Sequence, residues 1–217
     1  FELDDTHVLE PEWATGAVYK IINSKQLADA KGILYLNLLP DILKKRKEED
    51  FEYPKNKHKF IIELMKKFEI CYRIDKNRVL VPDLLQVEEM DFDFPYDEPL
   101  RFVMEYEFLP KSIMPRFIVK MHHDIKPGLQ WRTGVVLADK DLHSEAVVRA
   151  DEVDKKVSIH VTGDQKREYF AIIRKTLRNI AGSFDKLPVT ELVPLPDSKE
   201  VYVEYKELIG YEKHGKK

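Results

Sequence analysis

The stretch that decides the fold is LRFVMEYEFLPKSIMPRFIVKMHHDIKPGLQWRTGVVL, residues 100–137. Its first residues alternate between two sets, the period of two that is typical of a strand, with one set being Leu100, Phe102, Met104 and Tyr106. Pro110 then breaks the pattern, Ser112 can cap a helix, and Pro115 is tolerated in a first turn. Apolar residues next recur every four positions, which lines one helical face: Ile113, Phe117, Met121 and Ile125. Strand, break and amphipathic helix predict a packed α+β module without a visible catalytic constellation.

The rest of the second half predicts a mainly antiparallel sheet packed by helices. The predicted strands after the helix are 129–138, 145–150, 156–161 and 189–193. Gly163 and Asp164 begin the strongest helical pattern of the chain, which continues to Phe184. The tail 201–213 fits a final helix, and a strand stays possible there.

The first half contains the parts of a winged-helix domain. The predicted elements are a strand at Thr6–Leu9, helices at 11–23, 38–43 and 56–68, a strand at 32–36 and a hairpin at 70–81. Asn37 is the expected cap of the second helix, and Gly16 inside the first predicts close packing there. The buried stripe expected on the third helix is Phe60, Ile61, Leu64, Met65 and Phe68.

A change of composition separates the halves. The segment EEMDFDFPYDEP, residues 88–99, is acidic without apolar periodicity, and Pro95 and Pro99 disfavour regular structure near them. We therefore predict a winged-helix-like domain over 1–88, a linker over 89–99 and an α+β domain over 100–217.

Composition excludes several classes of protein. Hydrophobic residues at 43% provide a core, and a net charge of −3 argues against a dedicated binder of nucleic acid or anionic membranes. No apolar run approaches the roughly 20 residues of a membrane-spanning helix, and no signal-peptide pattern opens the chain. The single cysteine, Cys71, predicts a reducing and cytoplasmic setting, and the start at Phe1 suggests a fragment of a longer protein.

Chemistry-bearing motifs are absent. No glycine-rich phosphate loop occurs, so neither standard device for nucleotide binding is present. His122 and His123 precede Asp124, but adjacent helical histidines point about 100 degrees apart and do not chelate one ion well. We expect them and Cys71 to be structural, and we expect no metal, cofactor or catalytic residue in this chain.

Three functions stay open at this level. A winged-helix DNA-binding regulator is possible because the third helix and its approach carry cations: Lys55, Lys57, Lys59, Lys66 and Lys67. A small hydrolase has less support, since no titratable pair has a diagnostic spacing. A contact surface is favoured by side chains of the types enriched at interface hot spots, namely Tyr106, Phe108, Trp131 and Arg132.

Three segments are similar to the COR domain (C-terminal of Roc) of Roco proteins, more to bacterial or archaeal members than to the human leucine-rich-repeat kinase. They are HVLEPEWATGAVYKII at 7–22, LMKKFEICYRIDKNRVLVPDLL at 64–85, and the 100–137 stretch with its LPKSIMPRF and WRTGVVL. The resemblance covers nearly the whole chain in order.

This resemblance implies a non-catalytic module of a signalling protein. It implies an upstream Roc GTPase domain that would hold GTP or GDP and Mg, with leucine-rich repeats before it. The first half would pack against Roc, and the second half would form a homodimer coupled to the GTP cycle. Tyr106 and Phe108 match the position of the Roc contact, and Trp131 and Arg132 are our candidates for the dimer surface. No nucleic acid or membrane partner is expected.

Overall fold

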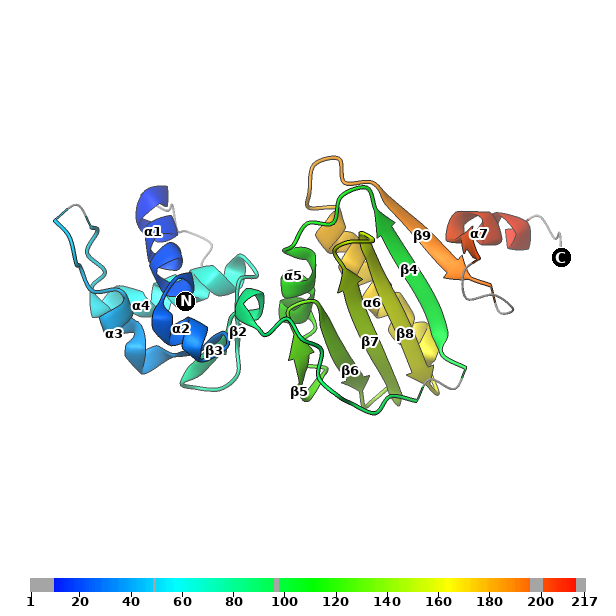
Figure 1. Ribbon diagram of the computed structural model, residues 1–217, viewed down its shortest axis with the longest axis horizontal. Helices are drawn as coiled ribbons and strands as arrows, with labels where there is room; N and C mark the ends of the chain where they lie inside the picture. The colour runs from blue at the N-terminus through cyan, green and yellow to red at the C-terminus, as the bar shows by residue number, and fades with distance from the viewer. Residues whose placement is uncertain (1–9, 49, 96–97, 196–200, 214–217) are drawn as a thin grey trace. The chain divides into compact units, whose positions relative to one another are not determined.

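The computed structural model describes residues 10–48, 50–95, 98–195 and 201–213, and the chain divides into two compact units (Figure 1). Unit 1 is Phe1–Leu85 and unit 2 is Gln86–Lys217, so the division falls three residues before Glu88. The strand predicted at Thr6–Leu9 lies outside the described residues. The α+β class is confirmed, since both units combine helices with antiparallel sheets.

Unit 1 packs its helices around a three-stranded antiparallel sheet of order β1-β3-β2. Its helices and strands are α1 (Pro11–Ile22), α2 (Lys25–Asp29), β1 (Ile33–Tyr35), α3 (Leu39–Ile42), α4 (Lys55–Lys67), β2 (Tyr72–Arg73) and β3 (Arg78–Leu80). The sequence did not predict α2, which Ser24 caps through its side chain. Asn37 lies inside a 3-10 turn, Leu36–Leu38, and makes no cap hydrogen bond. The winged-helix identity of this unit stays a prediction.

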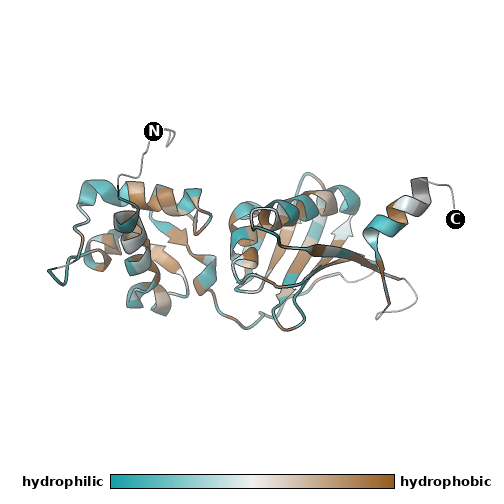
Figure 2. Ribbon diagram, turned by 90° about the horizontal axis from the view of Figure 1, so that it is seen from above, coloured by the Kyte–Doolittle hydropathy of each residue, from teal (hydrophilic) through white to brown (hydrophobic). Residues whose placement is uncertain are grey.

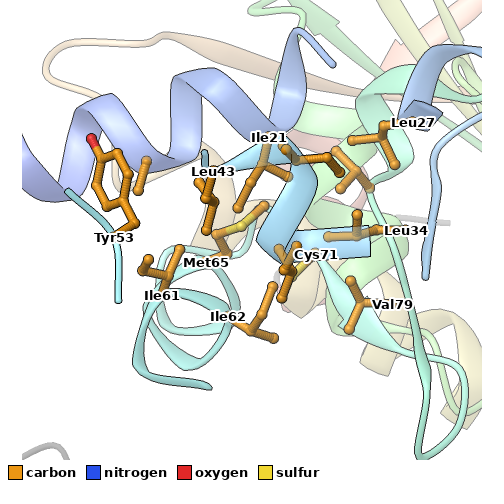
Figure 3. Packing of buried hydrophobic residues seen from close by; sticks show 14 residues of the cluster. Ile21, Leu27, Leu34, Leu43, Tyr53, Ile61, Ile62, Met65, Cys71 and Val79 are labelled. Atoms are coloured by element: carbon orange, nitrogen blue, oxygen red, sulfur yellow. The ribbon is translucent and has the colours of Figure 1, made fainter. Parts of the chain in front are cut away.

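The core of unit 1 joins its four helices to the strands β1 and β3 (Figure 3). Ile61 and Met65 of α4 are buried against residues of α1 and the sheet, as the helical spacing predicted. Phe68 was assigned wrongly to this stripe, because α4 ends at Lys67 and the Phe68 side chain is 63% exposed. Gly16 is closely packed as expected, since a Cβ there would lie 2.7 Å from the Tyr53 hydroxyl.

Unit 2 is a seven-stranded antiparallel sheet of order β10-β9-β4-β8-β7-β6-β5 with helices against one face. Its elements are β4 (Leu100–Tyr106), α5 (Ile113–Lys120), β5 (Ile125–Trp131), β6 (Gly134–Asp139), β7 (Ser144–Asp151), β8 (Lys156–Gly163), α6 (Lys166–Ala181), β9 (Val189–Pro194), β10 (Tyr202–Glu204) and α7 (Tyr205–Lys213). Figure 2 shows α5 and α6 together on one side of the sheet. Phe102 of β4 packs on Phe170 of α6, with ring centroids 4.7 Å apart.

The 100–137 stretch differs from its prediction in two ways. Helix α5 ends at Lys120, and Ile125 begins a strand although its spacing fits the helix. The strand predicted at 129–138 is a hairpin, because β5 ends at Trp131 and β6 returns from Gly134. Ser112 precedes α5 but makes no cap hydrogen bond. The tail contains both elements considered for it, the strand β10 and then α7.

The segment predicted as a linker packs on the sheet. We call residues Gln86–Phe94 the strap. Val136 of β6 and Val147 of β7 are cross-strand partners. The next pair, Val135 and Val148, is in register with Phe102, which faces α6. Because successive residues of a strand point to opposite faces, Val136 and Val147 point away from the helices. Phe94 of the strap is buried in one cluster with these valines, and Met90 and Phe92 pack against that cluster. The strap therefore covers part of the second face of the sheet.

Candidate interaction surface

Tyr106 is buried inside unit 2, whereas Phe108 is exposed on its surface. The Tyr106 side chain is 2% exposed and points into the core with Met104, as strand alternation requires. Burial, together with the nearby charge of Glu191, raises the pKa of the Tyr106 hydroxyl. Phe108 follows the end of β4 and is 66% exposed. Of the two predicted contact residues, only Phe108 offers its ring to a partner.

Trp131 is an interior residue. Its side chain is 2% exposed and packs in the cluster under the strap, with the Phe92 ring centroid 6.0 Å away. Gly134 makes room for it, because a Cβ there would lie 2.2 Å from the indole Cζ2 atom. The predicted dimer contact therefore does not fit the Trp131 side chain in this conformation.

Arg132 occupies the turn between β5 and β6, and its surroundings are partly apolar. Its backbone N–H donates to the Gln86 carbonyl oxygen at 2.8 Å. Its Nε atom is buried and has no hydrogen-bond partner among the described residues. A guanidinium in this position can bind a carboxylate of another chain through its remaining N–H groups.

Several loops meet Arg132 at one end of the sheet. The Tyr106 N–H donates to the Lys155 carbonyl at 2.9 Å, which joins the end of β4 to the β7–β8 turn. A small hollow opens there, lined by Leu109, Pro110, Lys111, Ile113, Met114, Arg132, Thr133, Ala150 and Glu152. Val153 in that turn is 88% exposed. We call this hollow, together with Phe108 and Val153, the end surface. It combines the exposed side chains of Phe108 and Val153 with an arginine whose Nε atom has no hydrogen-bond partner among the described residues, and aromatic and arginine side chains are types enriched at protein interfaces.

The sequence missed part of this surface. Val153 gave no signal because a single valine in a charged turn is unremarkable. Thr133 lies in the β5–β6 turn and Ala150 in β7, and the register that pairs Gly134 with Arg149 brings them together. The interpretation that the segment 88–99 lacks apolar periodicity was wrong, since Met90, Phe92 and Phe94 alternate with acidic residues, the period of a half-buried extended chain.

In the histidine pair, His122 is half-buried and His123 is exposed. His122 and His123 follow α5 instead of lying within it, and their ring centroids are 3.8 Å apart. Asp124 accepts a hydrogen bond from the Tyr169 hydroxyl at 3.2 Å, and burial raises the pKa of its carboxyl group. Within the described ranges, no group of three or more His, Cys, Asp or Glu side chains could hold a metal ion.

The five lysines predicted on α4 differ in their surroundings. Lys55, Lys57, Lys59 and Lys67 are exposed, whereas the Lys66 ammonium pairs with Glu63 at 2.7 Å. In the part of the chain that the structure describes, no helix is long and apolar enough to span a membrane.

The chain spans about a fifth or less of the length of the curated relatives that it matches. A Roc-COR-CHAT protease from Runella zeae is 28% identical over 212 residues, which is 94% of this chain and 21% of that protein. The probable serine/threonine-protein kinase pats1 of Dictyostelium discoideum is 23% identical over 207 residues, 86% of this chain and 6% of that protein. A solved structure of Methanosarcina barkeri Roco2 RocCORdC bound to GDP is 56% identical, covers 36% of this chain and 24% of that chain, and has a TM-score of 0.35.

Two family models cover the chain in order. The model described as C-terminal of Roc, COR-A domain matches residues 1–85, the same residues as unit 1. The model described as C-terminal of Roc, COR-B domain matches residues 97–217, within unit 2. The DNA-binding alternative gains no support from these matches. The chain therefore belongs to the COR family and is the COR-A and COR-B region of a Roco protein.

Proposed function

We propose that this chain is a non-catalytic module that joins Roco subunits and couples them to the Roc GTPase domain of the same protein. The observation that carries the proposal is the pair of family matches over 1–85 and 97–217, both named for their place C-terminal of Roc. GTP or GDP and Mg would then be held by Roc, and this chain would contribute surfaces in the cytoplasm.

We assign the Roc contact of unit 2 to the end surface. Phe108 is exposed beside the hollow, in which the Arg132 Nε atom has no hydrogen-bond partner among the described residues. Aromatic and arginine side chains dominate the binding energy of most protein interfaces. Tyr106 acts from inside, because its buried ring supports the strand that ends just before Phe108.

Binding of purified Roc to the 217-residue chain tests this assignment. Phe108→Ala should weaken the affinity by about tenfold or more, the effect of removing a hot-spot aromatic. Ile172→Ala is the matched control, since Ile172 is 45% exposed on α6 in the same unit. Equal affinities for the two variants would remove the end surface as the Roc contact.

Homodimerisation through unit 2 is the second part of the proposal. A two-fold symmetric pair is the default arrangement of such modules. Light scattering on the full chain should give a molar mass that rises toward twice 25.6 kDa with concentration. A constant monomer mass at high micromolar concentration would contradict this part.

A further inference from the structure

The strap is attached to the sheet beside the end surface. At one point the Arg132 N–H donates to the Gln86 carbonyl oxygen at 2.8 Å. At the second point the Arg149 guanidinium binds Glu89, with Nε 2.9 Å and Nη2 2.6 Å from Oε1. The same guanidinium lies over the Phe92 ring, 5.5 Å from its centroid. The strap is thus held by two arginines from neighbouring strand ends.

The residues that follow these two arginines line the hollow. Thr133 follows Arg132, Ala150 follows Arg149, and both contribute to the wall of the hollow together with Arg132 itself. They are joined directly, because the Ala150 N–H donates to the Thr133 carbonyl oxygen at 2.7 Å. The backbone that carries the two arginines therefore also forms part of the wall of the hollow.

Trp131 makes this connection stiff. Its indole fills the space between the strap and β6, in contact distance of Phe92 and of the backbone at Gly134. A rigid, fully buried ring leaves no empty space into which its neighbours could move. The indole of Trp131 thus links the strap to the β5–β6 hairpin through direct packing.

We propose that docking of the strap and binding at the end surface are thermodynamically coupled. This rests on the proposed function, in which the partner at the end surface is Roc. Gln86 directly follows Leu85, the last residue of unit 1, so the strap carries the effect of Roc binding to the connection between the COR-A and COR-B units. Because coupling is reciprocal, Roc should stabilise the docked strap by the factor by which the docked strap strengthens Roc binding.

Amide hydrogen exchange on the full chain, with and without saturating Roc, measures both events in one experiment. Slowed exchange at 107–114 and 150–154 reports binding at the end surface and so tests the proposed function. Slowed exchange in the strap, by about fivefold or more, reports the coupling. Protection of the first segments with unchanged exchange in the strap would overturn the coupling alone. Protection of neither would overturn the proposed Roc contact.

A pair of matched variants separates coupling from direct contact of Roc with the strap. Glu89→Gln breaks the pair with Arg149, whereas Asp91→Asn makes the same chemical change on an exposed residue between Met90 and Phe92. Glu89→Gln should speed exchange of the strap about threefold, and Phe92→Ala, which undocks it further, should weaken Roc binding about fivefold. Asp91→Asn should change neither quantity. Weaker Roc binding by Asp91→Asn would show direct contact and overturn the proposal.

Discussion

Gly134→Ala is expected to destabilise unit 2 through one contact. An added Cβ would lie 2.2, 2.4 and 2.9 Å from the indole atoms Cζ2, Cε2 and Cη2 of Trp131. Non-bonded carbon atoms normally lie about 3.5–4.0 Å apart, and the Trp131 ring is enclosed by the strap and by Val136 and Val147. The ring or the hairpin must therefore shift, which for an overpacked core costs about 1–3 kcal/mol.

Urea unfolding followed by Trp131 fluorescence measures this cost. The chain has two tryptophans, Trp13 in unit 1 and Trp131 in unit 2, so a Trp13→Phe background leaves one reporter. With a slope of about 2 kcal/mol per molar urea, the midpoint should fall by roughly 1 M. Gly210→Ala is the control, since nothing lies within 4 Å of its added Cβ. An unchanged midpoint and emission for Gly134→Ala would refute the packing described for Trp131.

The remaining predictions concern unit 1 and two buried titratable groups. Gly32 has φ +86°, and its added Cβ would lie 2.6 Å from the Val81 carbonyl oxygen. Gly32→Ala should therefore lower the urea midpoint of unit 1, which Trp13 reports, and leave the midpoint of unit 2 unchanged. A shift of both midpoints would contradict an effect confined to unit 1. Burial raises the pKa of the Cys71 thiol to about 12, so the native chain should resist alkylation at pH 8 and react only on unfolding. Burial, with the charges of Arg149 and Arg101, lowers the pKa of His160 from 6.5 to about 4. The unfolded chain then binds more protons in this window, so stability should fall as the pH decreases from about 6.5 to 4, and His160→Gln should flatten that slope in urea titrations.

Strands with a clear period of two were predictable from the sequence. β4 is a central strand whose alternating residues face the helices, and β7 and β8 lie where short apolar runs between turn residues placed them. The end of α5 was not predictable from spacing, because Ile125 keeps the helical interval. The β5–β6 turn was also hidden, since Arg132 and Thr133 are not typical turn residues and Gly134 is the first residue of the next strand.

Exposure of the candidate contact residues could not be read from their types. Tyr106 and Phe108 share the same parity in the sequence, but β4 ends at Tyr106 and the chain turns away before Phe108. Trp131 resembles a surface hot spot by type, but the strap, distant by some forty residues in sequence, buries it together with Val136 and Val147. The family resemblance limited the candidate contact residues to a few positions, and the packing of unit 2 shows which of these side chains are exposed.

Single-turnover GTP hydrolysis by Roc, with and without a saturating amount of the 217-residue chain, tests the central claim most directly. The chain should change the rate constant of Roc, Phe108→Ala should abolish most of that change at the same concentration, and Ile172→Ala should retain it. A rate constant that is the same with and without the wild-type chain, under conditions where the two proteins are shown to bind, would contradict coupling.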